Sequence, residues 1–219
     1  FGTFELNVNL VWRVDRMKRI TIIGGGASGT LLALNLLKYK GERRLEINLV
    51  EKRPHIGRGV AFSTQEDAHL LNVPAGKMGA YADDVEHFHR WLNENEMNYS
   101  ASAFVPRRIF GEYLRAQLEE ANNAKAENIE LNIFDDEAVD VRIENGKANV
   151  QLASGDHIYS EKVALAFGNF LPPHPTVADQ SFIASPKYFQ DPWTPEVFDS
   201  LDPDDALLIV GTGLSMVDV

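Results

Sequence analysis

The chain has 219 residues, of which 44% are hydrophobic and 24% charged, as in a globular protein with a sizeable core. Its formal net charge of −11 argues against nucleic acid or an anionic membrane as a partner. The sequence has no cysteine and no run near the roughly 18 apolar residues of a membrane span, which excludes disulfides and thiolate metal sites and fits a cytoplasmic location.

The first sixteen residues, FGTFELNVNLVWRVDR, precede Met17 and lack the basic start and long apolar core of a signal peptide. We expect a native start at Met17. Residues 1–16 would then be vector-derived or the product of an early start; the alternative is that they form a genuine N-terminal arm.

A β-rich segment, residues 19–23, runs directly into the glycine-rich stretch GGGASG at 24–29. Leucines then recur at helical spacing until Gly41, and a second strand at 45–50 ends in Glu51. This order of strand, glycine turn, helix, strand and acid predicts the βαβ unit of a Rossmann-like dinucleotide fold.

The glycine turn has the spacing G-x-G-x-x-G. In such a turn the first glycine permits the tight bend, the second lets the backbone approach a pyrophosphate, and the third lets helix and strand pack closely. Glu51 is predicted to accept hydrogen bonds from both ribose hydroxyls, which requires a free 2′-hydroxyl, as in NAD or the adenosine half of FAD. The predicted cofactor contacts here are Gly24, Gly26, Ala27, Ser28, Gly29, Glu51 and Lys52.

Residues 52–82 form a long irregular stretch, which is more often functional than filler in a compact domain. Arg58, between two glycines, could reach the pyrophosphate in a bidentate manner, or it could be a solvated surface arginine. Asn72 could contact the flavin edge, or it could serve simple turn chemistry.

Two helices are predicted next. Asp83 or Asp84 can cap a helix that runs through Leu92, and a second helix starts near Pro106. Arginines at 107 and 108 are unfavourable at a helix start, so they indicate either an anionic partner or a solvated helix end.

His87 and His89 do not share a helix face, and no further ligand set is evident, so no metal site is predicted.

A strand at 128–134 is followed by segments 138–144, 148–153 and 157–160, joined by Asn-Gly and Ser-Gly turns. This pattern predicts an inserted three-stranded β-meander, whose Val139 is a candidate cofactor contact.

The apolar strand at 163–168 is expected to be buried on both faces and to end at the candidate residue Gly168. A plain NAD domain lacks such a meander, so the meander favours FAD. The turn Ala166-Phe167-Gly168 approximates the A-T-G-like turn of flavoproteins, with Phe in place of Thr.

Seven prolines between 171 and 203 predict a linker, after which residues 207–210 read as a buried strand. A second loop, G-x-G-x-S, follows at Gly211, Gly213 and Ser215. Only four residues come after Ser215, too few for a stable helix. We therefore expect a fragment that does not bind NAD(P)H at this loop and holds flavin weakly or not at all.

The motifs GRGVAFS, HLLNVPAGKMGAYADDVEHFHRWL, FVPRRIFGEYL, ALAFGN and VGTGLSMVDV resemble a bacterial family of FAD/NAD(P)-binding proteins, distantly related to flavin-containing and amine N-hydroxylating monooxygenases. The resemblance spans 17–219. It implies an FAD-binding domain over 17–203, complete except for a C-terminal return, and the first strand and glycine loop of an NAD(P)H domain over 204–219.

The expected function is therefore the FAD-binding part of a flavin-dependent NAD(P)H oxidoreductase, in which hydride passes to the flavin and electrons then pass to oxygen or an organic acceptor. No side-chain catalyst can be recognised from spacing, because the flavin carries such chemistry. The alternatives are a non-catalytic nucleotide-binding or redox-sensing module, and a plain NAD-dependent dehydrogenase.

Overall fold

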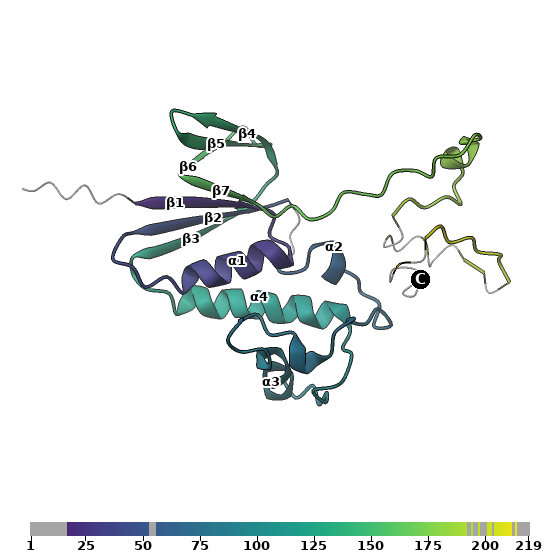
Figure 1. Cartoon of the computed structure of the whole chain (residues 1–219), viewed down its shortest axis with the longest axis horizontal. Helices are drawn as coiled ribbons and strands as arrows, with labels where there is room; N and C mark the ends of the chain where they lie inside the picture. Colours follow the sequence, from purple (N-terminus) through teal and green to yellow (C-terminus); the bar gives the residue numbers. More distant parts are fainter. Residues whose placement is uncertain are drawn as a thin grey trace, which may run out of the picture.

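The computed structural model describes residues 17–52, 56–191, 194, 197, 201–202, 204–211 and 213. Its centre is a four-stranded parallel sheet in the order β3-β2-β1-β7 (Figure 1). In register, Ile22 of β1 lies between Leu49 of β2 and Ala164 of β7. The predicted α/β class with a parallel sheet is confirmed. The strands are β1 (Lys18–Ile23), β2 (Leu45–Glu51), β3 (Ile129–Asp135) and β7 (Lys162–Leu165).

Helices cover one face of this sheet. Helix α1 lies against the sheet, α4 packs beside it, and α3 lies beyond α4 (Figure 1). Both long helices bury residues three or four apart, for example Thr30, Ala33, Leu34 and Leu37 of α1, which is the pattern of a helix with one apolar face. The helical elements are α1 (Ala27–Leu37), α2 (Gly59–Phe62), η1 (Ala75–Lys77), α3 (His87–Glu94), α4 (Arg107–Asn123) and η2 (Ser181–Ala184).

The predicted β-meander forms a separate antiparallel sheet on the opposite face (Figure 1). It comprises β4 (Ala138–Glu144), β5 (Lys147–Leu152) and β6 (His157–Ser160). Asn145 and Gly146 both have positive φ, 52° and 77°, as a two-residue hairpin turn requires. A small second core of Ile23, Val50, Val150, Leu152 and Ile158 lies between meander and parallel sheet. The domain therefore has three layers.

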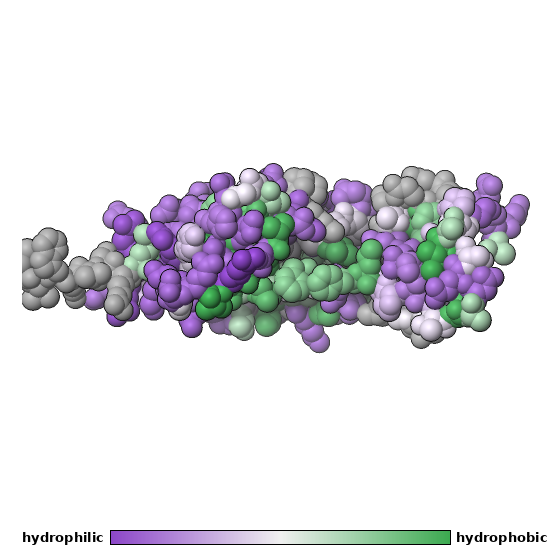
Figure 2. Space-filling model, turned by 90° about the horizontal axis from the view of Figure 1, so that it is seen from above, coloured by the Kyte–Doolittle hydropathy of each residue, from purple (hydrophilic) through white to green (hydrophobic). Residues whose placement is uncertain are grey.

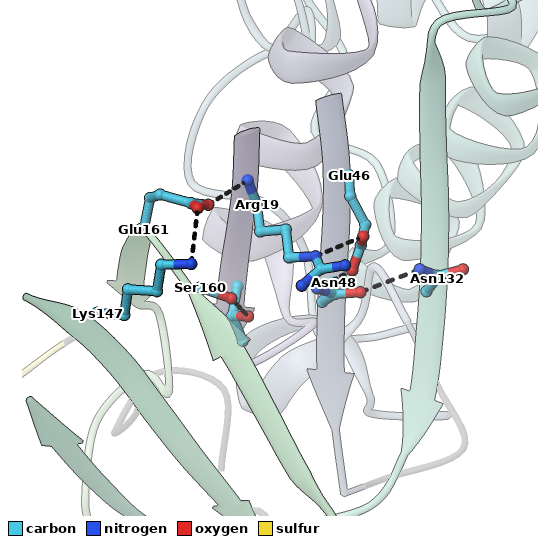
Figure 3. Close-up of polar contacts among 8 residues, drawn as sticks. Arg19, Glu46, Asn48, Asn132, Lys147, Ser160 and Glu161 are labelled. Atoms are coloured by element: carbon cyan, nitrogen blue, oxygen red, sulfur yellow. Dashed lines mark hydrogen bonds and ion pairs between the residues drawn. The ribbon is translucent and has the colours of Figure 1, made fainter. Parts of the chain in front are cut away.

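Hydrogen bonds between polar side chains lie on the same face of the parallel sheet as this second core (Figure 3). Strands β1 and β2 direct Ile22 and Leu49 toward the helices. On the other face, Ile23 and Val50 belong to the second core, and the remaining alternate positions are polar. Thr21 Oγ1 and Ser160 Oγ, both fully buried, share a hydrogen bond of 2.5 Å. Further along the same face, the polar contacts are Arg19 Nε to Glu46 at 2.8 Å, Asn48 Nδ2 to Glu46 at 3.1 Å and Asn132 Nδ2 to Asn48 Oδ1 at 3.1 Å.

Strand β7 differs from its prediction. It ends at Leu165 rather than Gly168, and its residues are exposed or only half-buried, with Leu165 63% exposed. The reason is its place at the sheet edge: among the described residues it pairs with β1 alone. The expectation of a strand buried on both faces was wrong.

The predicted buried strand at 207–210 was also wrong. These residues belong to no strand, and all four are exposed, Leu208 by 87%. A strand needs a neighbour to satisfy its backbone groups, and the described residues place none beside this segment.

The predicted cap of α3 was wrong as well. The helix begins at His87, with Glu86 at the N-cap and no capping side chain. Asp84 instead pairs with Arg90, an interaction that lowers the pKa of the Asp84 carboxyl. In the described part of the chain, no helix combines the length and apolarity needed to cross a membrane.

Candidate dinucleotide-binding site

The glycine turn after β1 is built on close backbone contacts. Gly24 has φ +103°, and a Cβ there would lie 2.3 Å from the carbonyl oxygen of Ala166. A Cβ at Gly29 would lie 1.8 Å from the carbonyl oxygen of Gly24. No side chain fits at either position. The turn is thus packed against two backbone groups, the carbonyl of its own first residue and the chain that follows β7.

The peptide groups of Gly25 are hydrogen-bonded to three other elements. Its N–H donates to Glu51 Oε2 at 2.7 Å. Its carbonyl accepts from the Thr30 hydroxyl at 2.9 Å and from the N–H of Gly57 at 2.8 Å. Glu51 therefore braces the loop, a role that the sequence did not indicate; its predicted ribose contact remains a prediction. Thr30 and Gly57 were missed as loop-holding residues.

Gly26 is the N-cap of α1, and no side chain caps this helix. The first N–H groups of a helix have no intrahelical acceptor, so those of α1 are suited to an anion, with Ala27 and the exposed Ser28 in the first turn. A Cβ at Gly26 would lie 3.3 Å from the Cα of Gly59. The second glycine of the motif thus faces another backbone segment.

Arg58 lies between Gly57 and Gly59, which pack against the glycine turn and α4. Its side chain is half-buried and forms no hydrogen bond or ion pair with the described residues, whereas its backbone carbonyl accepts from the Phe62 N–H at 3.2 Å. Lys52, by contrast, pairs with Glu137 at 2.8 Å on the surface. Of these two predicted cationic contacts, Arg58 has no anionic partner among the described residues.

Val139 lines an open, mainly apolar groove of about 520 Å³ with Ile23, Leu165 and Phe167. The groove adjoins the glycine turn, because a Cβ at Gly24 would lie 2.8 Å from the Phe167 nitrogen. Figure 2, which looks down on the meander side, shows exposed apolar side chains on this face. The structure thus brings Val139 and the turn to one region.

Two other predicted contacts, Asn72 and Gly168, lie outside this groove lining. Asn72 is exposed in the irregular stretch between α2 and η1. Gly168 has φ +75° and open space where a side chain would be. Among the described residues, no hydrogen bond or ion pair joins Asn72 to the glycine turn, and its contact with the flavin edge stays a prediction.

Of the second glycine loop, the structure describes Gly211 and Gly213. Gly211 has φ +127°, and a side chain at Gly211 or Gly213 would meet nothing within 4 Å. Ser215 lies outside the described residues. The close contacts that shape the first loop are not found at these two glycines.

The arginines at the start of α4 have partners within the chain. Arg107 Nε donates to the Leu70 carbonyl at 2.9 Å. Arg108 pairs with Asp67 at 2.6 Å and Glu112 at 3.4 Å, and its hydrogen bond lowers the pKa of the Asp67 carboxyl. An external anion is not needed to explain either cation.

The two helix histidines are engaged in local hydrogen bonds. His87 Nδ1 and the Tyr113 hydroxyl are 2.9 Å apart, and His89 Nε2 lies 3.1 Å from the Tyr99 carbonyl. No group of three or more potential metal ligands occurs within the described residues.

These features fit a dinucleotide. The loop glycines are required by close backbone contacts, α1 has no side-chain cap, and an acid stands at the end of β2. Together with the three layers, they define a Rossmann-like dinucleotide-binding domain.

The particular family follows from the sequence. Residues 21–170 match the model of the FAD-NAD(P)-binding family, and the chain belongs to that family. FAD and NAD(P) are the cofactors that the family description names, which confirms the resemblance stated above.

Solved structures similar to this chain include several monooxygenases. A flavin-containing monooxygenase from Stenotrophomonas maltophilia shares 16% identity over 69% of this chain and 38% of its own, with a TM-score of 0.49. An open structure of cyclohexanone monooxygenase shares 13% identity over 69% of this chain and 27% of its own, with a TM-score of 0.48. An oxidized steroid monooxygenase bound to NADP shares 17% identity over 73% of this chain and 28% of its own, with a TM-score of 0.47. The chain thus spans well under half the length of these proteins. No curated protein matches it significantly.

Proposed function

We propose that this chain is the FAD-binding part of a flavin-dependent NAD(P)H oxidoreductase, monooxygenase-like in its overall reaction. When bound, FAD would supply the redox chemistry, accepting hydride from NAD(P)H and passing electrons to oxygen or an organic acceptor. The protein's own part is to hold the dinucleotide and to shield its rings from water.

The observation that carries this proposal is the hydrogen-bonded peptide of Gly25. Glu51, Thr30 and Gly57 fix it from three elements, so the backbone of the turn is preorganised before any ligand arrives. A fixed turn before an uncapped helix presents N–H groups to a pyrophosphate without a further ordering cost.

The remaining residues take complementary roles in the proposal. Arg58 would neutralise pyrophosphate charge, and the carboxylate of Glu51 would accept from a ribose hydroxyl and repel a 2′-phosphate. Val139 and Phe167 would cover an aromatic ring of the dinucleotide from the apolar groove.

Titration of the purified 219-residue chain with FAD tests the binding role, with flavin fluorescence as the signal. We expect saturable one-to-one binding, however weak. A chain that binds NAD but not FAD would instead be a plain dehydrogenase domain, and one that binds neither would refute the proposal.

The redox role is tested on the protein purified from cells that express its native gene. Anaerobic NADPH should bleach the visible absorbance of the flavin, and air should restore it. A flavin that stays oxidised with both NADH and NADPH would favour a non-catalytic sensing module.

A further inference from the structure

The backbone of Gly57, Arg58 and Gly59 is wedged between the glycine turn and α4. On one side, the Gly57 N–H donates to Gly25, and a Cβ at Gly59 would lie 3.2 Å from the Cα of Gly26. On the other side, a Cβ at Gly57 would lie 3.0 Å from the carbonyl oxygen of Gly111.

Gly111 lies in the first half of α4, buried and facing this wedge. Glycine inside a helix is unfavourable relative to alanine, so its presence there calls for a steric reason. That reason is close by. A Cβ at Gly111 would lie 2.8 Å from Cγ of Arg58 and 3.2 Å from Cβ and the carbonyl oxygen of Phe62. The missing side chain leaves the space in which the Arg58 stem lies.

We propose that Gly111 is a positioning residue for Arg58, seating its stem so that the guanidinium can bind the phosphates of the dinucleotide. This inference rests on the proposed FAD-binding function. It assigns a role in ligand binding to a residue more than fifty positions away from the glycine segment and on a different helix.

The distances show which atoms would have to move if a methyl group were added at Gly111. The atom at 2.8 Å is Cγ of Arg58, which must move by rotation about the Cα–Cβ bond of a side chain without polar contacts to the described residues. The Phe62 atoms at 3.2 Å need to move only a few tenths of an ångström. Alanine is also the better helix former. Gly111→Ala should therefore displace Arg58 and leave the fold intact.

The experiment is a double-mutant cycle on the full chain, with ADP as the phosphate-bearing probe and adenosine as the matched probe without phosphate. Gly111→Ala and Arg58→Ala should each weaken ADP binding about tenfold, the loss expected for a charge-assisted contact. The double variant should lose no more than Arg58→Ala alone. Adenosine affinity should be the same in all four proteins, and the melting temperature of Gly111→Ala should not fall.

Arg115→Ala is the charge-matched control, since Arg115 is an exposed α4 arginine that pairs with Glu119; it should bind ADP like wild type. The inference is overturned if Gly111→Ala binds ADP normally, if the two losses multiply, or if adenosine binding falls in parallel. Normal FAD binding by Arg58→Ala would overturn this inference and the pyrophosphate role of Arg58 but not FAD binding itself, whereas a wild-type chain that binds neither FAD nor ADP would overturn the proposed function.

Discussion

At the scale of single residues, the glycine turn depends on internal contacts as much as on a ligand. Gly24 and Gly29 are required because carbonyl oxygens occupy the positions of their missing Cβ atoms. Gly25 is fixed at both of its peptide groups. Substitutions in this turn should therefore change the protein even before the cofactor is added, and two positions allow this to be measured.

Glu51→Ala removes the acceptor of the Gly25 N–H and the proposed ribose contact together. FAD affinity should fall by roughly 1–3 kcal/mol, the usual loss when a hydrogen-bonded charged partner is deleted. Flavin fluorescence titration measures it. Glu51→Gln, which keeps an oxygen for Gly25, should lose less. Wild-type affinity in the alanine variant would contradict both roles of Glu51.

Substitutions at Gly26 test the close backbone contact between Gly26 and Gly59. The Gly26 φ of −64° suits any residue, so a substitution there meets only the steric obstacle at 3.3 Å. Gly26→Ala should be tolerated with a small shift, whereas Gly26→Val should push the Gly57–Gly59 backbone away, lower the melting temperature and abolish flavin retention. A yellow, fully loaded valine variant would show that this contact does not limit the site.

At the scale of elements, the meander is joined to the parallel sheet through the buried hydroxyl pair of Thr21 and Ser160. Thr21→Val leaves the Ser160 hydroxyl buried without this partner and should lower the free energy of unfolding by about 1–3 kcal/mol. Adding Ser160→Ala should restore part of the loss, because no polar group of the pair is then buried. Urea unfolding gives both values, and strict additivity would argue against direct coupling.

The packing of α3 on α4 centres on Tyr113, which is fully buried among aromatic rings and accepts the Ala80 N–H at 3.0 Å. Burial raises the pKa of Tyr113 from 10.0 to about 12. The folded state thus favours the neutral phenol. This stabilisation is complete below pH 10 and is lost as pH rises from 10 through 12, a change on the order of 2 kcal/mol. Unfolding free energies across this range should fall in wild type and fall less in Tyr113→Phe.

The sequence predicted elements wherever a local pattern determined them. The strand–glycine–helix–strand unit and the meander with its Asn-Gly turn lie where expected, and the family match confirms the FAD/NAD(P)-binding assignment. The prediction that β7 and residues 207–210 are buried was wrong, because an apolar run does not reveal whether neighbouring chain segments cover it. Thr30 and Gly111 were missed because their partners, Gly25 and Arg58, meet them only in the folded chain.

At the scale of the whole molecule, the two glycine loops are unequal. The first stands between a paired strand and a helix, whereas the four residues before Gly211 are exposed and unpaired within the described structure. We therefore expect no tight NADPH binding by the 219-residue chain at 211–215. Calorimetric titration checks this, with FAD as the positive control. Tight one-to-one binding that disappears in Gly211→Val would refute it.

The contact between Gly24 and the backbone of Ala166 also bears on how the protein is made. Gly24 leaves the ribosome about 140 residues before Ala166, a delay of about 7–28 s at roughly 5–20 residues per second. Throughout that interval the turn lacks the chain segment that closes it, although its own six residues have long been synthesised. A motif that looks local in the sequence therefore gains its last close backbone contact only when the chain leaving β7 has been synthesised.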